Sequence, residues 1–151
     1  MKKIQDIIKE KILILDGAMG TMIQQYNLVE KDFRGLRFAD SKCLLKGNND
    51  ILNITRPDVV EDIHEKYLQA GADIITTNTF SSQRISQADY SLQDVCEEMA
   101  CEGAKIARNT ADKYSTEDKP RFVAGSIGPT TKTCSMSSDI SNPAARDLTY
   151  D

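Results

Sequence analysis

Three apolar runs of the chain end in groups that could bind a small polar molecule. Glycine, carboxylate, hydroxyl or amide groups follow each run directly: Asp16-Gly17-Ala18-Met19-Gly20, Thr77-Asn78-Thr79 and Gly128-Pro129-Thr130. A carboxylate pairs with an ammonium group, hydroxyls and amides hydrogen-bond polar ligands, and glycine lets the backbone approach a ligand closely. If the three ends lie together, they predict a binding site for a charged or polar small molecule.

Metal binding and nucleophilic catalysis have weaker support in the sequence. No two of the four cysteines form a C-x-x-C pair, and His64 is the single histidine. A zinc site built from these residues is an alternative to ordinary buried or half-buried thiols. His64 is predicted to be a surface or boundary residue rather than a catalyst. Cys134 is predicted to be a passive thiol, because no basic partner can be placed beside it.

The elements that would position these groups alternate between strands and helices. Ile12-Leu13-Ile14-Leu15, closed by Asp-Gly, is typical of a strand buried on both faces. The segments 72–80 and 122–127 are predicted to be the second and third strands. A short amphipathic helix is expected over 2–10. Residues 21–56 are predicted to form a long excursion with short structured pieces inside it.

Two longer helices are predicted between the strands. The first has Thr55 as N-cap and Pro57 in its first turn, and it ends at Gly71. The second covers 91–114, and its inner face would consist of Leu92, Val95, Met99, Ala100, Ile106 and Ala107. The last residues, 148–151, look like the approach to another helix.

This order predicts an α/β protein with parallel βαβ units. The carboxyl ends of parallel strands meet at one edge of the sheet, where ligands collect. The three polar strand ends would therefore lie on the same rim and form one site.

Composition narrows the function classes. The chain has 151 residues, a net charge of −4 and scattered basic residues, which fits one soluble domain and gives no surface for nucleic acid. No apolar run reaches the roughly 20 residues needed to span a membrane, and charged residues interrupt the only possible signal segment. A cytoplasmic location is the expectation.

Five segments, in order, resemble the homocysteine S-methyltransferase family, and in particular its cobalamin-dependent methionine synthase branch. The resemblance covers nearly the whole chain, and the combination is highly specific: DGAMGTMIQ (16–24), DFRG (32–35), KGNNDIL (46–52), AGADIITTNTF (70–80) and RFVAGSIGPT (121–130). The FRG and KGNND segments favour the cobalamin-dependent branch over betaine- and S-methylmethionine-dependent relatives.

The resemblance implies a (β/α)8 TIM barrel, of which residues 1–151 would be the N-terminal part, incomplete with about three strands. It also implies methyl transfer to the sulfur of homocysteine on a zinc ion held by three cysteine thiolates. Those cysteines follow later strands, so nothing here is carried over as a metal ligand or a catalytic residue. Methylcobalamin and methyltetrahydrofolate would be bound by other modules of the full-length enzyme.

Part of the substrate clamp can be carried over by resemblance. Asp16 would face the ammonium group of homocysteine, the backbone N–H groups of Gly17, Ala18 and Met19 would lie near its carboxylate, and a second-strand contribution would come from Thr77, Asn78 and Thr79. The plainer interpretations are that Asp16 caps a turn and that 77–79 is an ordinary strand exit. Gly128-Pro129-Thr130 is either a rigid turn or the hinge of a substrate loop.

The chain departs from the family pattern at a few positions. Thr76 stands where the cobalamin-dependent branch usually has Glu, Thr131 where Asn is expected, and Ser138 where Pro is usual. The missing carboxylate at Thr76 puts the electrostatics of the rim in doubt.

Three strands cannot close a barrel, so the third strand would expose an apolar edge. We therefore expect this polypeptide to be marginally stable alone, or to need the remainder of the barrel or a complementing chain. Three functions stay open. They are an inactive piece of a methionine synthase module, one half of a split methyltransferase whose partner supplies the Cys-Cys element, and a non-catalytic small-molecule-binding protein. Calorimetry with homocysteine and no zinc should detect saturable binding only for the last.

Overall fold

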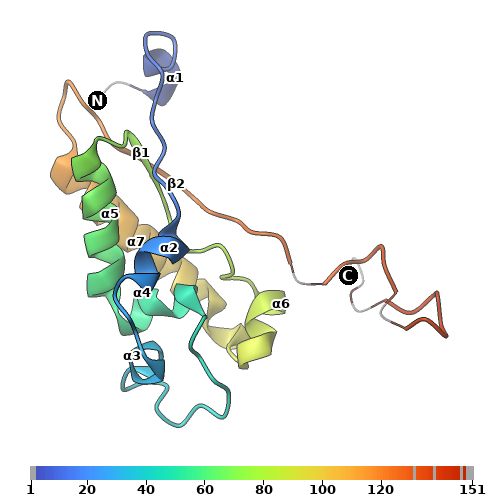
Figure 1. The fold of residues 1–151 in the computed structure, drawn as a ribbon. Helices are drawn as coiled ribbons and strands as arrows, with labels where there is room; N and C mark the ends of the chain where they lie inside the picture. Colours follow the sequence, from blue (N-terminus) through green and yellow to red (C-terminus); the bar gives the residue numbers. More distant parts are fainter. Residues whose placement is uncertain (1–2, 131, 138, 147, 149–151) are drawn as a thin grey trace.

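A small parallel sheet packed against two long helices forms the body of the protein. The computed structural model describes residues 3–130, 132–137, 139–146 and 148. Strands β1 (Ile74–Thr76) and β2 (Phe122–Ala124) pair in parallel, with Ile75 opposite Val123. The connection between them contains α7 (Cys96–Tyr114), so the predicted βαβ unit is confirmed. Figure 1 shows α5 and α7 side by side along the sheet.

The run 12–15 differs from its prediction. It lies parallel to β1, but only Leu15 forms a bridge, to Ile74, and the Asp16 N–H donates to the Ile74 carbonyl. The predicted burial on both faces is wrong, since Ile12 is 91% and Ile14 61% exposed. The physical reason is that no described residue covers the outer side of this run. The described sheet therefore has two strands and one bridged segment rather than three full strands.

Helix α5 (Pro57–Ala70) begins and ends largely where the sequence predicts. Pro57 occupies its first turn, and Gly71 ends it with a φ of 112°, a left-handed conformation that glycine adopts without strain. The predicted N-cap is wrong. Thr55 belongs to the preceding helix α4 (Leu52–Thr55), and Arg56 takes the capping position without a side-chain cap.

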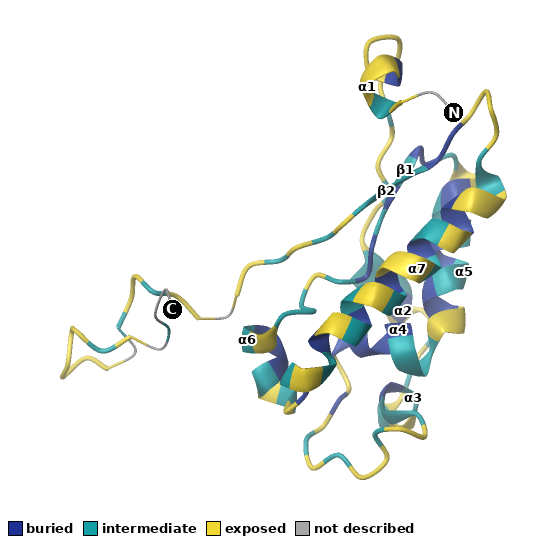
Figure 2. Cartoon of the chain, turned by 180° about the vertical axis from the view of Figure 1, so that it is seen from behind, coloured by how far each residue is buried: buried dark blue, intermediate teal, exposed yellow. Residues whose placement is uncertain are grey.

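Helix α7 follows a 3₁₀ turn, η3 (Gln93–Val95), and packs against α5. Met99 and Ala107 are fully buried as predicted, whereas Ala100 and Ile106 are only partly buried. The buried face continues through Gly103, Thr110 and Ala111. A Cβ atom on Gly103 would lie 2.6 Å from Asn53 Nδ2 of α4 and 2.8 Å from Thr79 Cγ2, so glycine lets α4 and the exit of β1 approach α7 closely. Figure 2 shows this buried side and the exposed outer side of α7.

The prediction that His64 is a surface or boundary residue is wrong. It is fully buried, and neither ring nitrogen has a hydrogen-bond partner among the described residues. Its position on α5 is four residues from both Val60 and Leu68, so it shares their inward-facing stripe. Burial lowers the pKa of His64 to about 4, so the ring is neutral at physiological pH.

The remaining elements are short. The predicted excursion contains α2 (Met19–Gln24), α3 (Glu30–Arg34), η1 (Asn49–Ile51) and α4. Helix α1 (Ile4–Ile7) precedes the sheet, and α6 (Arg84–Gln87) with η2 (Ala88–Tyr90) follows β1. No helix in the described part of the chain is both long and apolar enough to cross a membrane.

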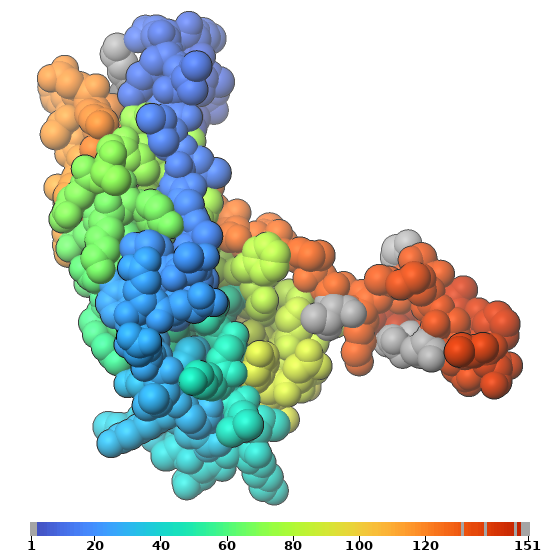
Figure 3. Space-filling model, viewed as in Figure 1, coloured from blue at the N-terminus to red at the C-terminus, as the bar shows by residue number. Residues whose placement is uncertain are grey.

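After β2 the chain leaves the body. Figure 3 shows the described residues beyond about 125 extending away from the helices, and Ile127 is 93% exposed. The helix expected to begin near 148 falls on residues 149–151, which lie outside the described part of the chain.

Candidate functional site

The first two strand ends are joined through Asp16 and Thr76. The Thr76 N–H donates to Asp16 Oδ2 over 2.8 Å, and the Thr76 hydroxyl lies 3.0 Å from Oδ1 and 3.2 Å from Oδ2. Burial raises the pKa of Asp16, and the two Thr76 donors oppose that rise. Thr76 therefore holds Asp16 in a fixed orientation.

The second and third strand ends are joined in the same way. The Ser126 N–H donates to Thr77 Oγ1 over 2.9 Å, and the Thr79 hydroxyl donates to the Ser126 carbonyl over 2.8 Å. The Gly128 N–H donates to the Phe80 carbonyl. A Cβ atom on Gly128 would lie 2.4 Å from that carbonyl oxygen, so only glycine fits there. The three polar ends thus gather on one rim, and Gly128 is part of a close-packed turn.

The segment after Asp16 leaves its backbone donors open. The N–H groups of Gly17, Ala18 and Met19 donate to no other backbone group among the described residues. The Tyr67 hydroxyl donates to the Ala18 carbonyl over 3.3 Å, and a Cβ atom on Gly17 would lie 2.9 Å from that hydroxyl oxygen. Burial and the charge of Asp16 both raise the pKa of Tyr67. Tyr67 is therefore a neighbour of the site that sequence reasoning did not single out.

The side chains of residues 77–79 are occupied within the protein. Thr77 and Thr79 bond to each other and to Ser126. Asn78 is buried, and its Nδ2 donates to the Asn49 carbonyl and to Asn53 Oδ1. These hydrogen bonds attach the end of the strand to Ser126 and to the segment that contains Asn49 and Asn53. Direct contact of Thr77, Asn78 and Thr79 with a ligand stays a prediction.

A cavity of about 380 Å³ opens beside this rim. Of the predicted site residues, Met19, Thr77 and Asn78 line it, together with Thr76. Asp16, Gly17, Ala18 and Thr79 do not. The other walls lie outside the predicted clamp. They come from Gly20, from residues 47–50, from the loop after β1 with Phe80, Ser81 and Tyr90, and from Ser126.

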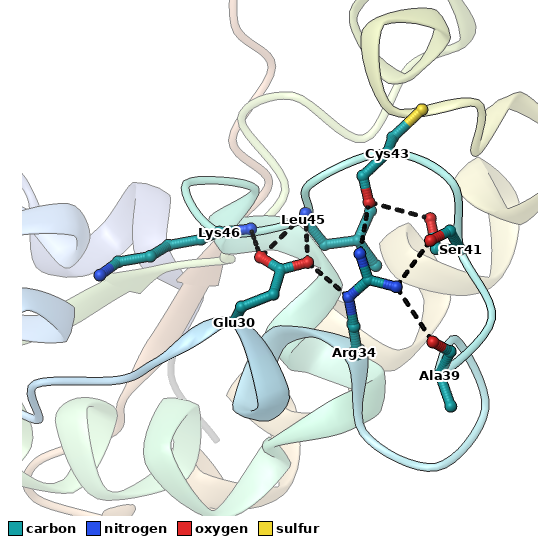
Figure 4. A network of polar contacts seen from close by, with 7 residues as sticks. All are labelled: Glu30, Arg34, Ala39, Ser41, Cys43, Leu45 and Lys46. Carbon is teal, nitrogen blue, oxygen red and sulfur yellow. Dashed lines mark hydrogen bonds and ion pairs between the residues drawn. The ribbon is translucent and has the colours of Figure 1, made fainter.

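Helix α3 positions the loop that leads to residues 47–50 (Figure 4). Glu30 accepts the N–H groups of Leu45 and Lys46, at 2.9 and 2.7 Å for its closest oxygens, and it also accepts Arg34 Nε. Arg34 donates onward to three backbone carbonyls of the loop, those of Ala39, Ser41 and Cys43. Sequence reasoning missed these roles, although Arg34 lies in the DFRG segment that signalled the family.

The KGNND segment is in turn bonded to the loop after β1. The side-chain amides of Asn48 and Gln87 exchange two hydrogen bonds, of 2.7 and 3.2 Å. Asp50 Oδ2 accepts the Ser81 N–H and the Ser82 hydroxyl, both at 2.7 Å. Burial raises the pKa of Asp50, against the effect of these two donors. The motif therefore shapes one wall of the cavity.

The cysteines and histidine do not fit a metal ion. Cys96 is buried, Cys101 is exposed and Cys43 lies near Ser91, while His64 is enclosed between helices. No three metal-ligating side chains among the described residues lie close enough together to hold a metal. A three-thiolate zinc site cannot be built from the described residues, so we derive no chemical step through zinc.

The fold is that of an α/β protein with a parallel sheet, and its polar groups gather at the strand ends, where proteins of this class commonly bind small molecules. Comparisons with known proteins narrow this class. The homocysteine S-methyltransferase profile matches residues 13–151, so the chain belongs to the homocysteine S-methyltransferase family.

Two crystal structures of the homocysteine methyltransferase MmuM from Escherichia coli have a similar fold. The TM-score is 0.63 for the metallated form, at 20% identity, and 0.65 for the oxidized form, at 21% identity. Each alignment covers 83% of this chain, but only 41% and 40% of the respective MmuM chains. This chain thus spans about two fifths of the length of those relatives.

Proposed function

We propose that residues 1–151 form the amino-acid-binding part of a homocysteine S-methyltransferase barrel of the cobalamin-dependent methionine synthase type. The family match and the hydrogen-bonded rim support this proposal. The choice of branch rests on the DFRG and KGNND segments, which build the loop beside the cavity.

The main support for this proposal is that the rim has one hydrogen-bond acceptor, Asp16 Oδ1, available to a ligand beside several backbone N–H donors that no described backbone group uses. Asp16 Oδ2 already accepts the Thr76 N–H, whereas Oδ1 receives only a shared hydroxyl proton and can accept the ammonium group of homocysteine. The N–H groups of Gly17, Ala18 and Met19 can donate to the substrate carboxylate. These groups bind and orient the amino-acid end. No described residue acts on the sulfur, so the chain alone is expected to have no methyltransferase activity.

Titration of the ¹⁵N-labelled chain with L-homocysteine, followed by NMR, tests this function. We expect saturating shifts at the amides of residues 17–19 with a Kd on the order of millimolar, because one ion pair and a few hydrogen bonds hold the ligand. Asp16→Asn should weaken binding about tenfold, and Asp94→Asn, which changes an exposed carboxylate, should not. Shifts confined to other amides, or equal binding by Asp16→Asn, would contradict the proposal.

A split methyltransferase is the second candidate, favoured by the exposed apolar side chains of Ile12, Ile14 and Ile127. A complementing polypeptide carrying the later strands and the Cys-Cys element should cover these side chains and restore methyl transfer. Calorimetry without zinc separates the non-catalytic alternative. Only that protein should give a binding curve that saturates at micromolar homocysteine, because the millimolar binding proposed above is too weak to saturate in that concentration range.

A further inference from the structure

The cavity beside the rim has a wall that the proposed homocysteine clamp does not use. Asn49, Asp50 and Tyr90 border it, whereas Asp16 does not. Met19 and Phe80 add apolar surface. At about 380 Å³ the cavity is in the size range of small-molecule sites.

Asp50 is the only charged residue among the described residues that line the cavity. The residue is 3% exposed, and both of its described hydrogen bonds, from Ser81 and Ser82, reach Oδ2. Oδ1 accepts no hydrogen bond from any described residue. A buried carboxylate with one open oxygen is electrostatically incomplete, because burial disfavours its charge and the donors on Oδ2 offset that cost only in part.

Two further polar groups on these walls are also open. The side-chain amide of Asn49 and the hydroxyl of Tyr90 make no hydrogen bond with the described residues, although both border the cavity. No lysine or arginine is among the described lining residues, so the walls offer no cation of their own to Asp50. A negatively charged ligand would be repelled, and a positively charged one would compensate the carboxylate.

We propose that this cavity is a second binding site, which takes a small protonated amine with its ammonium group on Asp50 Oδ1. The Asn49 amide oxygen and the Tyr90 hydroxyl supply further acceptors, and Met19 and Phe80 contact the alkyl part. The site uses neither Asp16 nor homocysteine. Because Met19, Thr77 and Asn78 of the predicted clamp line the same cavity, it adjoins the proposed homocysteine site and is tested independently of it.

n-Butylammonium chloride is the probe, and 1-butanol is its neutral counterpart of similar size. In NMR titrations of the full chain, n-butylammonium should give saturating shifts at the amides of Asn49, Asp50 and Ser81, and 1-butanol should not. Asp50→Asn keeps one oxygen for Ser81 and Ser82 but turns the open acceptor into an NH₂ donor. It should lower the affinity about tenfold or more, as loss of a charge-assisted hydrogen bond does.

Three controls assign the effect to this cavity. Asp94→Asn, at an exposed carboxylate, and Asp16→Asn, at the rim, should each leave the n-butylammonium affinity within about twofold of the parent chain. If Asp50→Asn fails to fold, intermolecular NOEs from the probe methylenes to the Tyr90 ring and the Met19 methyl group test the site in the parent chain.

The proposal is overturned if 1-butanol shifts the same amides as strongly, if folded Asp50→Asn binds the probe equally well, or if the NOEs are absent. Loss of binding in Asp16→Asn would move the probe to the homocysteine clamp and would equally reject a separate site. Failure of the homocysteine titration leaves these outcomes unchanged.

Discussion

The helical layer of this molecule buries its large apolar side chains, whereas the strand layer leaves several of them exposed. In α4, α5 and α7, large side chains such as Leu52, Ile63 and Met99 are fully buried against one another. Beside the strands, Ile12 and Ile14 of the bridged run and Ile127 beyond β2 are mostly exposed, although Ile75 within β1 is fully buried. Helices bury one stripe against a neighbour that the same chain supplies, whereas a parallel strand needs cover on both faces.

The two layers also differ in what they contribute, since one stabilises the fold and the other presents groups for ligand binding. The helical layer provides the apolar burial that stabilises the fold, and the strand layer presents the polar ends that could bind a ligand. Substitutions in the helical core should therefore change stability strongly, and substitutions at the rim should change mainly ligand binding.

Truncation in the helical core should cost the most. Ile63→Ala is expected to lower the free energy of unfolding by about 3 kcal/mol, because Ile63 is fully buried. The matched change in the strand layer, Ile14→Ala, should cost less than about 0.5 kcal/mol, since that side chain is 61% exposed. Urea unfolding followed by circular dichroism measures both. Equal losses of unfolding free energy in the two variants would show that the helical core does not dominate the stability of the fold.

His64 should make the helical layer sensitive to acid. Its pKa of about 4 in the folded chain lies below the ordinary value of 6.5, so the unfolded chain binds the proton first as pH falls. The contribution of neutral His64 to the free energy of unfolding is fully present above pH 6.5. As the unfolded chain takes up the proton, the free energy of unfolding should decrease by about 3 kcal/mol by pH 4. His64→Leu should remove this part of the pH dependence. An unchanged slope between pH 6.5 and 4 in that variant would assign the effect to other groups.

Glu30→Gln should loosen the loop that leads from α3 to residues 47–50. The variant loses the charge that accepts the Leu45 and Lys46 N–H groups and Arg34. A cost of about 2 kcal/mol is expected, with faster hydrogen exchange at these two amides. Glu97→Gln, at an exposed position on α7, is the control. Unaltered exchange at residues 45 and 46 would show that the network does not hold the loop.

Thr76→Val should give the smallest effect, on ligand binding rather than folding. It removes the hydroxyl that bonds to Asp16 but keeps the backbone N–H bond. If the proposed function is right, homocysteine affinity should fall about fivefold, and Thr76→Ser should restore it. NMR titration measures the affinities. Equal affinity for the Val and Ser variants would remove Thr76 from the positioning of Asp16.

Local signals in the sequence were sufficient for α5, for most of α7 and for the βαβ order, because periodicity, Pro57 and Gly71 act over a few residues. The same signals gave wrong predictions of burial where the residues that cover a side chain lie far away in the sequence. The aliphatic run 12–15 has the pattern of an interior strand, but its cover would have to come from elsewhere. His64 was placed at the surface by residue type, although its spacing from Val60 and Leu68 already indicated the inner stripe.

The residue order is enough to indicate the family, the order of the elements and the polar character of the three strand ends. The folded chain adds contacts that no local pattern predicts: Asp16 is held by Thr76, Thr77 and Thr79 bond to Ser126, and Asp50 borders a cavity with one oxygen open. Residue types fix which hydrogen bonds a segment can make. Which of them form depends on groups up to 60 positions apart being brought within about 3 Å, and packing alone achieves that.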